Sequence, residues 1–205
     1  LNRCKNTYHS RRSDLPNQAD RMEYINKMRK SYPFHPELID MFRLKWGQDS
    51  RFQRTRGVLR LLASIVKDLW TRRGSLTGTQ ALIHTSDVNL SNLPTLTGTI
   101  TSLMGSQWET VIHADVIGTS SNAYKIDNED PNNNIGKYNL TQGIATTILM
   151  ASLGNLQNKG LTIEELKLCI LKPSAFNHSE VNSALNKLEQ VAHYLYSTNV
   201  GSRSY

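Results

Sequence analysis

Three arginines at the start of a predicted helix are the residues whose type and spacing best suit a chemical role. Arg54, Arg56 and Arg60 accompany an apolar helical pattern that continues to Trp70. A helix dipole favours anions at the N-terminus, so an arginine in the first turn costs roughly a few tenths of a kcal/mol. A phosphate group would offset that cost, because helix N-termini and guanidinium groups both bind phosphate oxygens. The alternative is a core helix whose arginines are solvated on its outer face.

The helix that must position these arginines has the strongest periodicity in the chain. Its apolar face is made by Val58, Leu61, Leu62, Ile65 and Leu69. Thr55 can cap the start of this helix, which places Arg56 in the first turn. Arg56, Arg60 and Lys67 lie on another face, at offsets of four and seven residues. The spacing therefore predicts an amphipathic helix with one buried face and one basic face.

The segment that contains these arginines resembles a known family signature. Residues 52–63 read Phe-Gln-Arg-Thr-Arg-Gly-Val-Leu-Arg-Leu-Leu-Ala. This stretch is similar to a signature of large predicted prokaryotic ATPases of the AAA+ superfamily, the class with domain of unknown function 499 (DUF499). Further stretches match in the same order, at residues 32–38, 108–116, 125–127, 161–167 and 192–196. The resemblance covers roughly residues 15–205.

The resemblance implies a role for the arginines. AAA+ lids commonly have an arginine at a helix start that contacts the γ-phosphate of the subunit's own nucleotide. By similarity Arg56 takes this nucleotide-sensing role, with Arg54 as the second candidate and Arg60 one turn further on. Either Arg56 or Arg54 could instead act across a subunit interface. The resemblance also implies ATP and Mg²⁺ for the full-length protein, the rest of the ATPase chain as a partner, and a homo-oligomer.

The sequence lacks the parts of a complete nucleotide hydrolase. No stretch fits Gly-x-x-x-x-Gly-Lys-Ser/Thr, and no acidic Walker B strand is present. Nor does the sequence show a nucleophile elbow or the cysteine and histidine spacing of a zinc site. Because these parts bind Mg²⁺ and cradle the phosphates, we predict that this chain alone binds no cofactor and hydrolyses no ATP.

Length and composition favour a cytoplasmic fragment of a longer protein. The chain has 205 residues, 38% of them hydrophobic, which allows one large domain or two small ones. No apolar run approaches the ~18 residues of a membrane span, and no signal peptide opens the chain. Cys4 and Cys169 are the only cysteines, which is typical of a reducing compartment. The chain does not begin with methionine, so we interpret it as a fragment.

The charge is concentrated in the first part of the chain. Residues 1–75 contain 17 Lys and Arg against 7 Asp and Glu, whereas residues 76–205 contain 7 against 10. A basic half favours an anionic partner: nucleotide phosphates, nucleic acid, or an acidic surface of the same protein. Composition alone does not separate these three.

The predicted fold is mainly α with a small β component, in three parts. Residues 1–75 are expected to form a basic helical bundle, which resembles the AAA+ lid and whose polar residues 1–14 form a connection or an arm. Residues 76–137 are expected to mix strands and loops, with strand candidates at residues 81–84 and 110–117. On the second strand His113 and Asp115 would share a face, as a structural hydrogen bond or, with less support, a metal or catalytic pair.

Residues 138–205 are predicted to form a winged-helix-like domain. Its helices begin near Thr141, after Thr162 and near Ser179, and Thr162 with Glu165 forms a capping box. A polar turn over residues 199–202 would start the wing. The third helix could read DNA in such a fold, but it is not basic, so we favour packing against protein.

These observations lead to one principal hypothesis and two alternatives. The principal one is the lid and winged-helix-like part of a cytoplasmic prokaryotic AAA+ ATPase. By resemblance, such proteins are often encoded near DNA methylases and helicases, which suggests phage defence or DNA modification. The alternatives are a non-enzymatic DNA-binding module, supported by the basic N-terminal half, and a scaffold that docks partner proteins.

Overall fold

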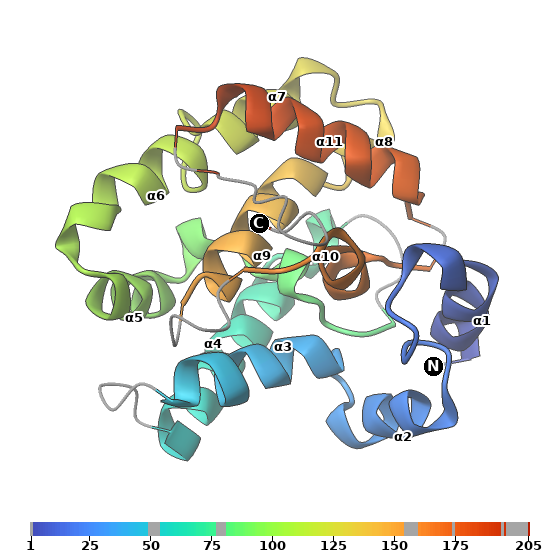
Figure 1. Ribbon diagram of the computed structural model, residues 1–205. Helices are drawn as coiled ribbons and strands as arrows, with labels where there is room; N and C mark the ends of the chain where they lie inside the picture. The colour runs from blue at the N-terminus through green and yellow to red at the C-terminus, as the bar shows by residue number, and fades with distance from the viewer. Residues whose placement is uncertain are drawn as a thin grey trace.

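Helices make up nearly all the regular structure of the computed structural model (Figure 1). The structure describes residues 2–48, 54–76, 81–153, 160–173, 175–193, 195 and 205. The mainly α fold class predicted from the sequence is confirmed. Within the described residues no helix is both long and apolar enough to cross a membrane.

The described residues of the first part of the chain form four helices. They are α1 (Asn2–Ser10), α2 (Met22–Ser31), α3 (Pro36–Asp40) and α4 (Arg54–Thr71). Pro36 opens α3, as its fixed backbone angle favours. The chain then continues beyond α3 through a π-helical turn (Met41–Lys45) and a 3-10 turn (Trp46–Gln48).

The remainder of the chain adds seven helices among the described residues. They are α5 (Pro94–Met104), α6 (Glu109–Asp115), α7 (Asn122–Glu129), α8 (Asn134–Lys137), α9 (Leu140–Ala151), α10 (Ile163–Ile170) and α11 (His178–Val191). Single 3-10 turns occur at Arg12–Asp14, Arg73–Ser75, Thr85–Asp87, Leu90–Asn92 and Ser106–Trp108.

Helix α9 lies at the centre of the larger hydrophobic core. All its residues except Gln142 are buried, which is the pattern of a helix covered on every side. Helices α7, α10 and α11 and the turn Thr85–Asp87 pack against it. The indole Nε1 of Trp46 donates a hydrogen bond to the carbonyl oxygen of Met150 at 2.9 Å and so ties the extension of α3 to α9. This core includes buried residues from Leu38 to Tyr205.

A second, smaller core joins the first helix to the C-terminal part of the chain. Cys4 and Tyr8 of α1 are fully buried, in a cluster that includes Leu168 of α10. Arg11 donates a hydrogen bond to the carbonyl oxygen of Phe176 at 3.1 Å. Figure 1 shows α1 beside the N-terminal end of α11. The arm predicted for residues 1–14 is therefore wrong over α1.

The predicted β component reduces to one isolated bridge in the described residues. Phe34 and Ile83 form a parallel bridge, which lies within the strand candidate 81–84. The strand predicted for residues 110–117 is wrong, because residues 109–115 form α6. Its β-branched residues favour strands only weakly, and packing against the core overrides that preference.

Two features predicted for the C-terminal part are confirmed. The side chain of Thr162 accepts a hydrogen bond from the Glu165 N–H at 3.2 Å, and Glu165 accepts one from the Thr162 N–H at 2.9 Å. This capping box opens α10. Helix α11 begins close to the predicted Ser179, after a second capping box formed by Asn177 and Glu180. The predicted wing over residues 199–202 lies outside the described residues, so the winged-helix domain and the three-part division stay predictions.

Candidate functional site

The predicted nucleotide-sensing arginines lie at the N-terminal end of α4. Arg54 is the first residue of the helix, and its side chain is outside the described part of the structure. Arg56 and Arg60 are exposed. Neither of them forms an ion pair or hydrogen bond with another described residue, and neither lines any of three pockets among the described residues. Both guanidinium groups are therefore available to a ligand or another protein surface.

One of the two carboxylates that the sequence offers as a partner for Arg56 is engaged elsewhere. Asp40 of α3 pairs with Lys27 of α2. Asp49, the other sequence candidate, lies outside the described residues. An ion pair between Arg56 and Asp40 is thus absent from the structure.

The opposite face of α4 fixes the helix in place. Leu61, Leu62, Ile65 and Leu69 are buried in the larger core. These are four of the five apolar residues predicted for that face, and Val58 packs against it while partly buried. Burial of this face leaves Arg56 and Arg60 directed away from the core.

The C-terminal end of α4 borders a polar pocket of about 390 Å³. Its charged lining residues are Arg72, Asp87, Lys137 and Lys172. The other lining residues are mostly polar: Ser75, Ser86, Asn89, Ser91, Tyr124, Tyr138, Asn139, Gln142 and Thr146, with Leu76, Val88, Leu90, Val116 and Gly143. Three cations against one carboxylate suit a small polar ligand with negative charge.

Asp87 organises one wall of this pocket. One of its carboxylate oxygens accepts a hydrogen bond from Lys172 at 2.6 Å, and the other accepts one from the His84 N–H at 2.7 Å. Burial would raise the pKa of the carboxyl group, but the charge of Lys172 and the hydrogen bonds from Lys172 and the His84 N–H act against burial, and the pKa is lowered. Asp87 is therefore a buried carboxylate held in its charged form.

Arg72 is fixed at the same wall. Its Nε donates to Asp68 at 2.7 Å and one terminal nitrogen donates to the carbonyl oxygen of Asp87 at 2.6 Å. Asp68 also accepts from Asn92 at 3.0 Å. Both cations on this wall, Arg72 and Lys172, are thus engaged within the protein.

Two stacked histidines are buried between the N-terminal helices and the turn Thr85–Asp87. The rings of His35 and His84 lie 4.4 Å apart at 19°. The Glu37 N–H donates to His35 Nδ1 at 3.4 Å, so His35 Nε2 carries the proton and donates to the Tyr8 hydroxyl at 2.9 Å. His84 Nδ1 donates to the carbonyl oxygen of Cys169 at 3.2 Å. Each ring is thereby held in one tautomer.

Burial keeps both histidines neutral. It lowers the pKa of His84 to about 4, against the opposing effect of Asp87. Burial also lowers the pKa of His35 well below its ordinary value, with His84 and Lys27 acting in the same direction. Neither histidine lines any of the three described pockets. We interpret the pair as a structural contact between α3 and the turn, not as an acid–base centre.

The two cysteines are buried and free. Burial raises the pKa of each thiol. Raised thiol pKa values and burial are typical of inert structural cysteines. The prediction that Cys169 is a buried thiol is confirmed.

The predicted pairing of His113 with Asp115 is wrong. Side chains two positions apart in a helix point roughly 200° apart around its axis. His113 is accordingly exposed, whereas Asp115 is buried. Asp115 accepts hydrogen bonds from Asn122 at 2.8 Å and from the His193 N–H at 3.0 Å. Within the described ranges no group of three or more His, Cys, Asp or Glu side chains could hold a metal ion.

A family model described as the DUF499 second domain matches residues 2–204. The chain belongs to the DUF499 second-domain family. Comparison with curated proteins and with solved structures gives no match.

Several matched motifs have structural roles in this DUF499 second domain. Asp127, from the motif at residues 125–127, accepts hydrogen bonds from the N–H groups of Thr141 at 2.9 Å and Gln142 at 3.0 Å. It thus caps the N-terminus of α9, where a carboxylate is favourable. Asp115 of α6 accepts a hydrogen bond from the His193 N–H and so joins α6 to the chain after α11. These two carboxylates hold helices in position.

Sequence analysis missed the polar pocket. Asp87 and Lys172 are 85 residues apart, and Lys137 belongs to a third segment. The only local signal was Asp68 and Arg72, four residues apart at the end of α4. That spacing predicts an ion pair on one helix face but no pocket.

Proposed function

We propose that this DUF499 second domain is a helical accessory domain of a AAA+ ATPase, and that Arg56 contacts the terminal phosphate of a nucleotide held by another domain. The observation that supports this proposal is the exposed Arg56 guanidinium in the first turn of a helix whose other face is buried. The description of the family as a second domain also supports a partner domain in the same protein. ATP and Mg²⁺ would bind to that other domain.

The chemistry of Arg56 suits such a contact. A guanidinium binds phosphate oxygens through two parallel hydrogen bonds. A phosphate near the first turn of α4 would also interact favourably with the helix dipole. Arg60 lies one turn further on and Arg54 opens the helix, so both remain alternative contacts. A cytoplasmic location and a task in phage defence or DNA modification are part of the same proposal.

ATP hydrolysis by the longer ATPase tests the proposal. Arg56→Ala should slow turnover by roughly 10-fold to 1000-fold, the range for losing a charge-assisted contact in the transition state. Arg56→Lys should recover only part of the rate, because an ammonium group does not reproduce the bidentate geometry. Lys30→Ala, an exposed cation on α2, is the matched control and should leave turnover unchanged.

The isolated chain provides a second control. Residues 1–205 alone should release phosphate from ATP at less than about 0.1 per second, below ordinary enzyme rates. Faster turnover by this chain, or normal turnover in Arg56→Ala, would contradict the proposal.

DNA binding is the second candidate function. Arg56, Arg60 and Lys67 follow one another along α4 over about 16 Å, and of the three only Lys67 lines one of the described pockets. An extended basic line suits a phosphate backbone. If it binds duplex DNA, affinity should fall steeply with salt and should be lost in Arg60→Glu. Helix α11 should contribute little, because its Lys187 is paired with Glu129 at 2.6 Å.

A further inference from the structure

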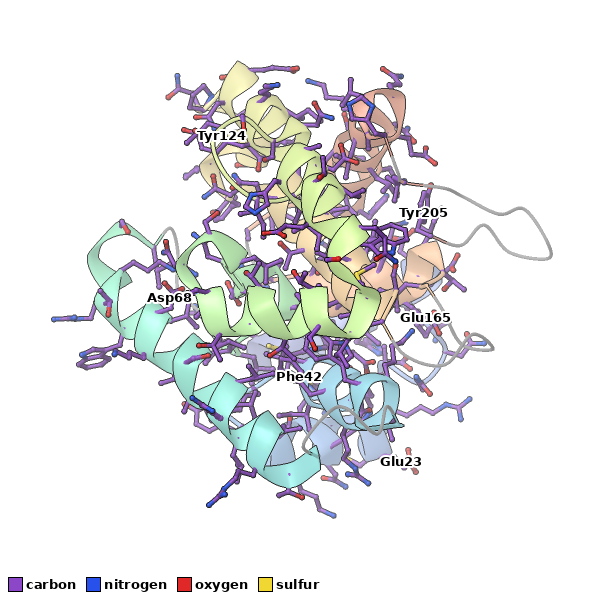
Figure 2. The ribbon with its side chains drawn as sticks, turned by 90° about the vertical axis from the view of Figure 1, so that its left-hand side faces the viewer. Glu23, Phe42, Asp68, Tyr124, Glu165 and Tyr205 are labelled. Carbon is purple, nitrogen blue, oxygen red and sulfur yellow. The ribbon has the colours of Figure 1, made fainter. Side chains whose placement is uncertain are left out.

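Helix α4 has an exposed apolar stripe in addition to its buried face. Leu59, Ala63, Val66 and Trp70 are all exposed, with exposed fractions of 63% for Leu59, 41% for Val66 and 68% for Trp70. Their spacing of four, three and four residues places them within roughly 60° of one another around the helix. Single exposed apolar residues are ordinary, but a line of them along a whole helix indicates a contact surface. We call these four residues the α4 stripe. Figure 2 shows helix α4, on which Asp68 is labelled.

A row of cations borders the α4 stripe along one side. At about 100° per residue, Arg56, Lys67 and Arg60 lie next to the stripe and on the side away from the core. All three are exposed, and they form no ion pair with another described residue. Arg73 extends the row past the end of the helix, with its guanidinium 4.7 Å from the centre of the Trp70 ring. The acidic residue of α4, Asp68, lies on a different face and pairs with Arg72.

The combination of stripe and cations specifies the chemistry of a partner. An amphipathic helix with an apolar face could lie along the α4 stripe in the manner of helix-in-groove recognition. Trp and Arg are also the residue types most enriched at the energetic centres of interfaces. Acidic residues along one edge of that helix would pair with Arg60 and Lys67, whereas basic residues there would be repelled.

A second copy of the chain is a poorer occupant. Two α4 helices packed antiparallel would bring the two rows of cations together, at a cost. A partner with acidic residues in that place has no such cost.

We propose that the α4 stripe docks an acidic amphipathic helix of another protein. This inference is independent of the nucleotide role of Arg56, because it needs no nucleotide and rests on Trp70, Arg60 and Lys67.

Peptide binding to the full 205-residue chain tests this proposal. One probe is a synthetic helix of 18 residues, the length of α4, with leucines spaced as in the stripe and glutamates along one edge. Its matched control has lysines in place of the glutamates. By fluorescence anisotropy without nucleotide, the acidic peptide should bind about 10-fold or more tightly than the basic one, and added salt should reduce the difference.

Variants of the chain locate the binding. Trp70→Ala should weaken binding of the acidic peptide by about 10-fold. Arg60→Glu combined with Lys67→Glu should reverse the preference between the two peptides. Lys30→Glu reverses an exposed charge on α2. It should change neither the affinity for the acidic peptide nor the preference between the two peptides. Melting temperatures should remain close to that of the parent chain, because all these side chains are exposed.

Three results would overturn the proposal. The first is the absence of binding by the acidic peptide, and the second is equal binding of both peptides, which indicates non-specific adhesion. The third is a concentration-dependent dimer in sedimentation that Trp70→Ala dissociates, because the stripe would then be occupied by a second copy. Peptide binding with no turnover defect in Arg56→Ala would instead refute only the nucleotide role.

Discussion

The two ends of α4 differ in how their arginines are used. At the C-terminal end Arg72 donates to the Asp68 carboxylate and to the Asp87 backbone, beside the buried pair of Asp87 and Lys172. At the N-terminal end Arg56 is exposed and has no partner among the described residues. The same residue type on one helix is thus structural at one end and available at the other. The surroundings of an arginine, and not its place in a motif, decide which role it can take.

The largest expected effect is at the C-terminal end. Asp87→Ala leaves Lys172 without its carboxylate and removes the acceptor for the His84 N–H. Loss of one partner of a buried ion pair costs about 3–5 kcal/mol, so the free energy of unfolding should fall by that amount. Urea denaturation followed by circular dichroism measures it. Glu23→Ala, at an exposed site on α2, should have almost no effect. A small loss in Asp87→Ala would mean that the wall is not a structural unit.

The two apolar faces of α4 should differ in a similar way. Leu62 is buried, so Leu62→Ala should lower the free energy of unfolding by about 2–5 kcal/mol through a cavity. Leu59→Ala is the matched change on the α4 stripe and should cost under about 0.5 kcal/mol. Equal losses in thermal or urea denaturation would show that the stripe is covered in the isolated chain.

The buried histidines predict a loss of stability in acid. The pKa of His84 is lowered to about 4 in the folded state, against about 6.5 when unfolded. Between these values the unfolded chain binds a proton that the folded chain does not, so stability falls as the pH falls from 6.5 to 4. The effect of His84 amounts to about 3 kcal/mol at most. Glu37, whose pKa is raised by burial, acts in the opposite direction.

A histidine variant separates these contributions. His84→Gln should flatten the dependence of unfolding free energy on pH across this window, measured by urea titration at several pH values. His113→Gln changes an exposed histidine and should leave the dependence intact. An unchanged slope in His84→Gln would place the acid sensitivity elsewhere.

The smallest expected changes in the free energy of unfolding come from substituting the two arginines, Arg72 and Arg56. Arg72→Ala removes hydrogen bonds to Asp68 and to the Asp87 backbone and should cost about 1–3 kcal/mol. Arg56→Ala should change the free energy of unfolding by less than about 0.5 kcal/mol. A reversed order in urea denaturation would remove the basis for treating Arg56 as the available arginine.

Local patterns in the sequence predicted much of the fold. The five apolar residues at helical spacing identified α4, and Thr162 with Glu165 identified the start of α10, because both signals arise within one helix. The strand at residues 110–117 was predicted wrongly because β-branched residues also pack in helices. Helix α1 was missed because its buried residues, Cys4 and Tyr8, make only one helical repeat in a polar segment.

The candidate site was less accessible to such analysis. The arginines of α4 stand out because a cation in the first turn of a helix is unfavourable. The polar pocket combines Arg72, Asp87, Lys137 and Lys172, which only the tertiary fold brings together. The exposed α4 stripe was also missed, because the sequence analysis assigned one apolar face to this helix and did not consider a second.

The contact between α1 and α10 has a consequence for how the protein is made. Tyr8 and Leu168 share a cluster although about 160 residues separate them. At roughly 5–20 residues per second, a ribosome needs about 8–30 s to synthesise that interval. During this time Leu168 is absent from the cluster that buries Cys4, so we expect the Cys4 thiol to be more accessible than in the finished protein. A short pulse of an alkylating reagent on nascent chains should therefore label Cys4, whereas the finished protein protects it.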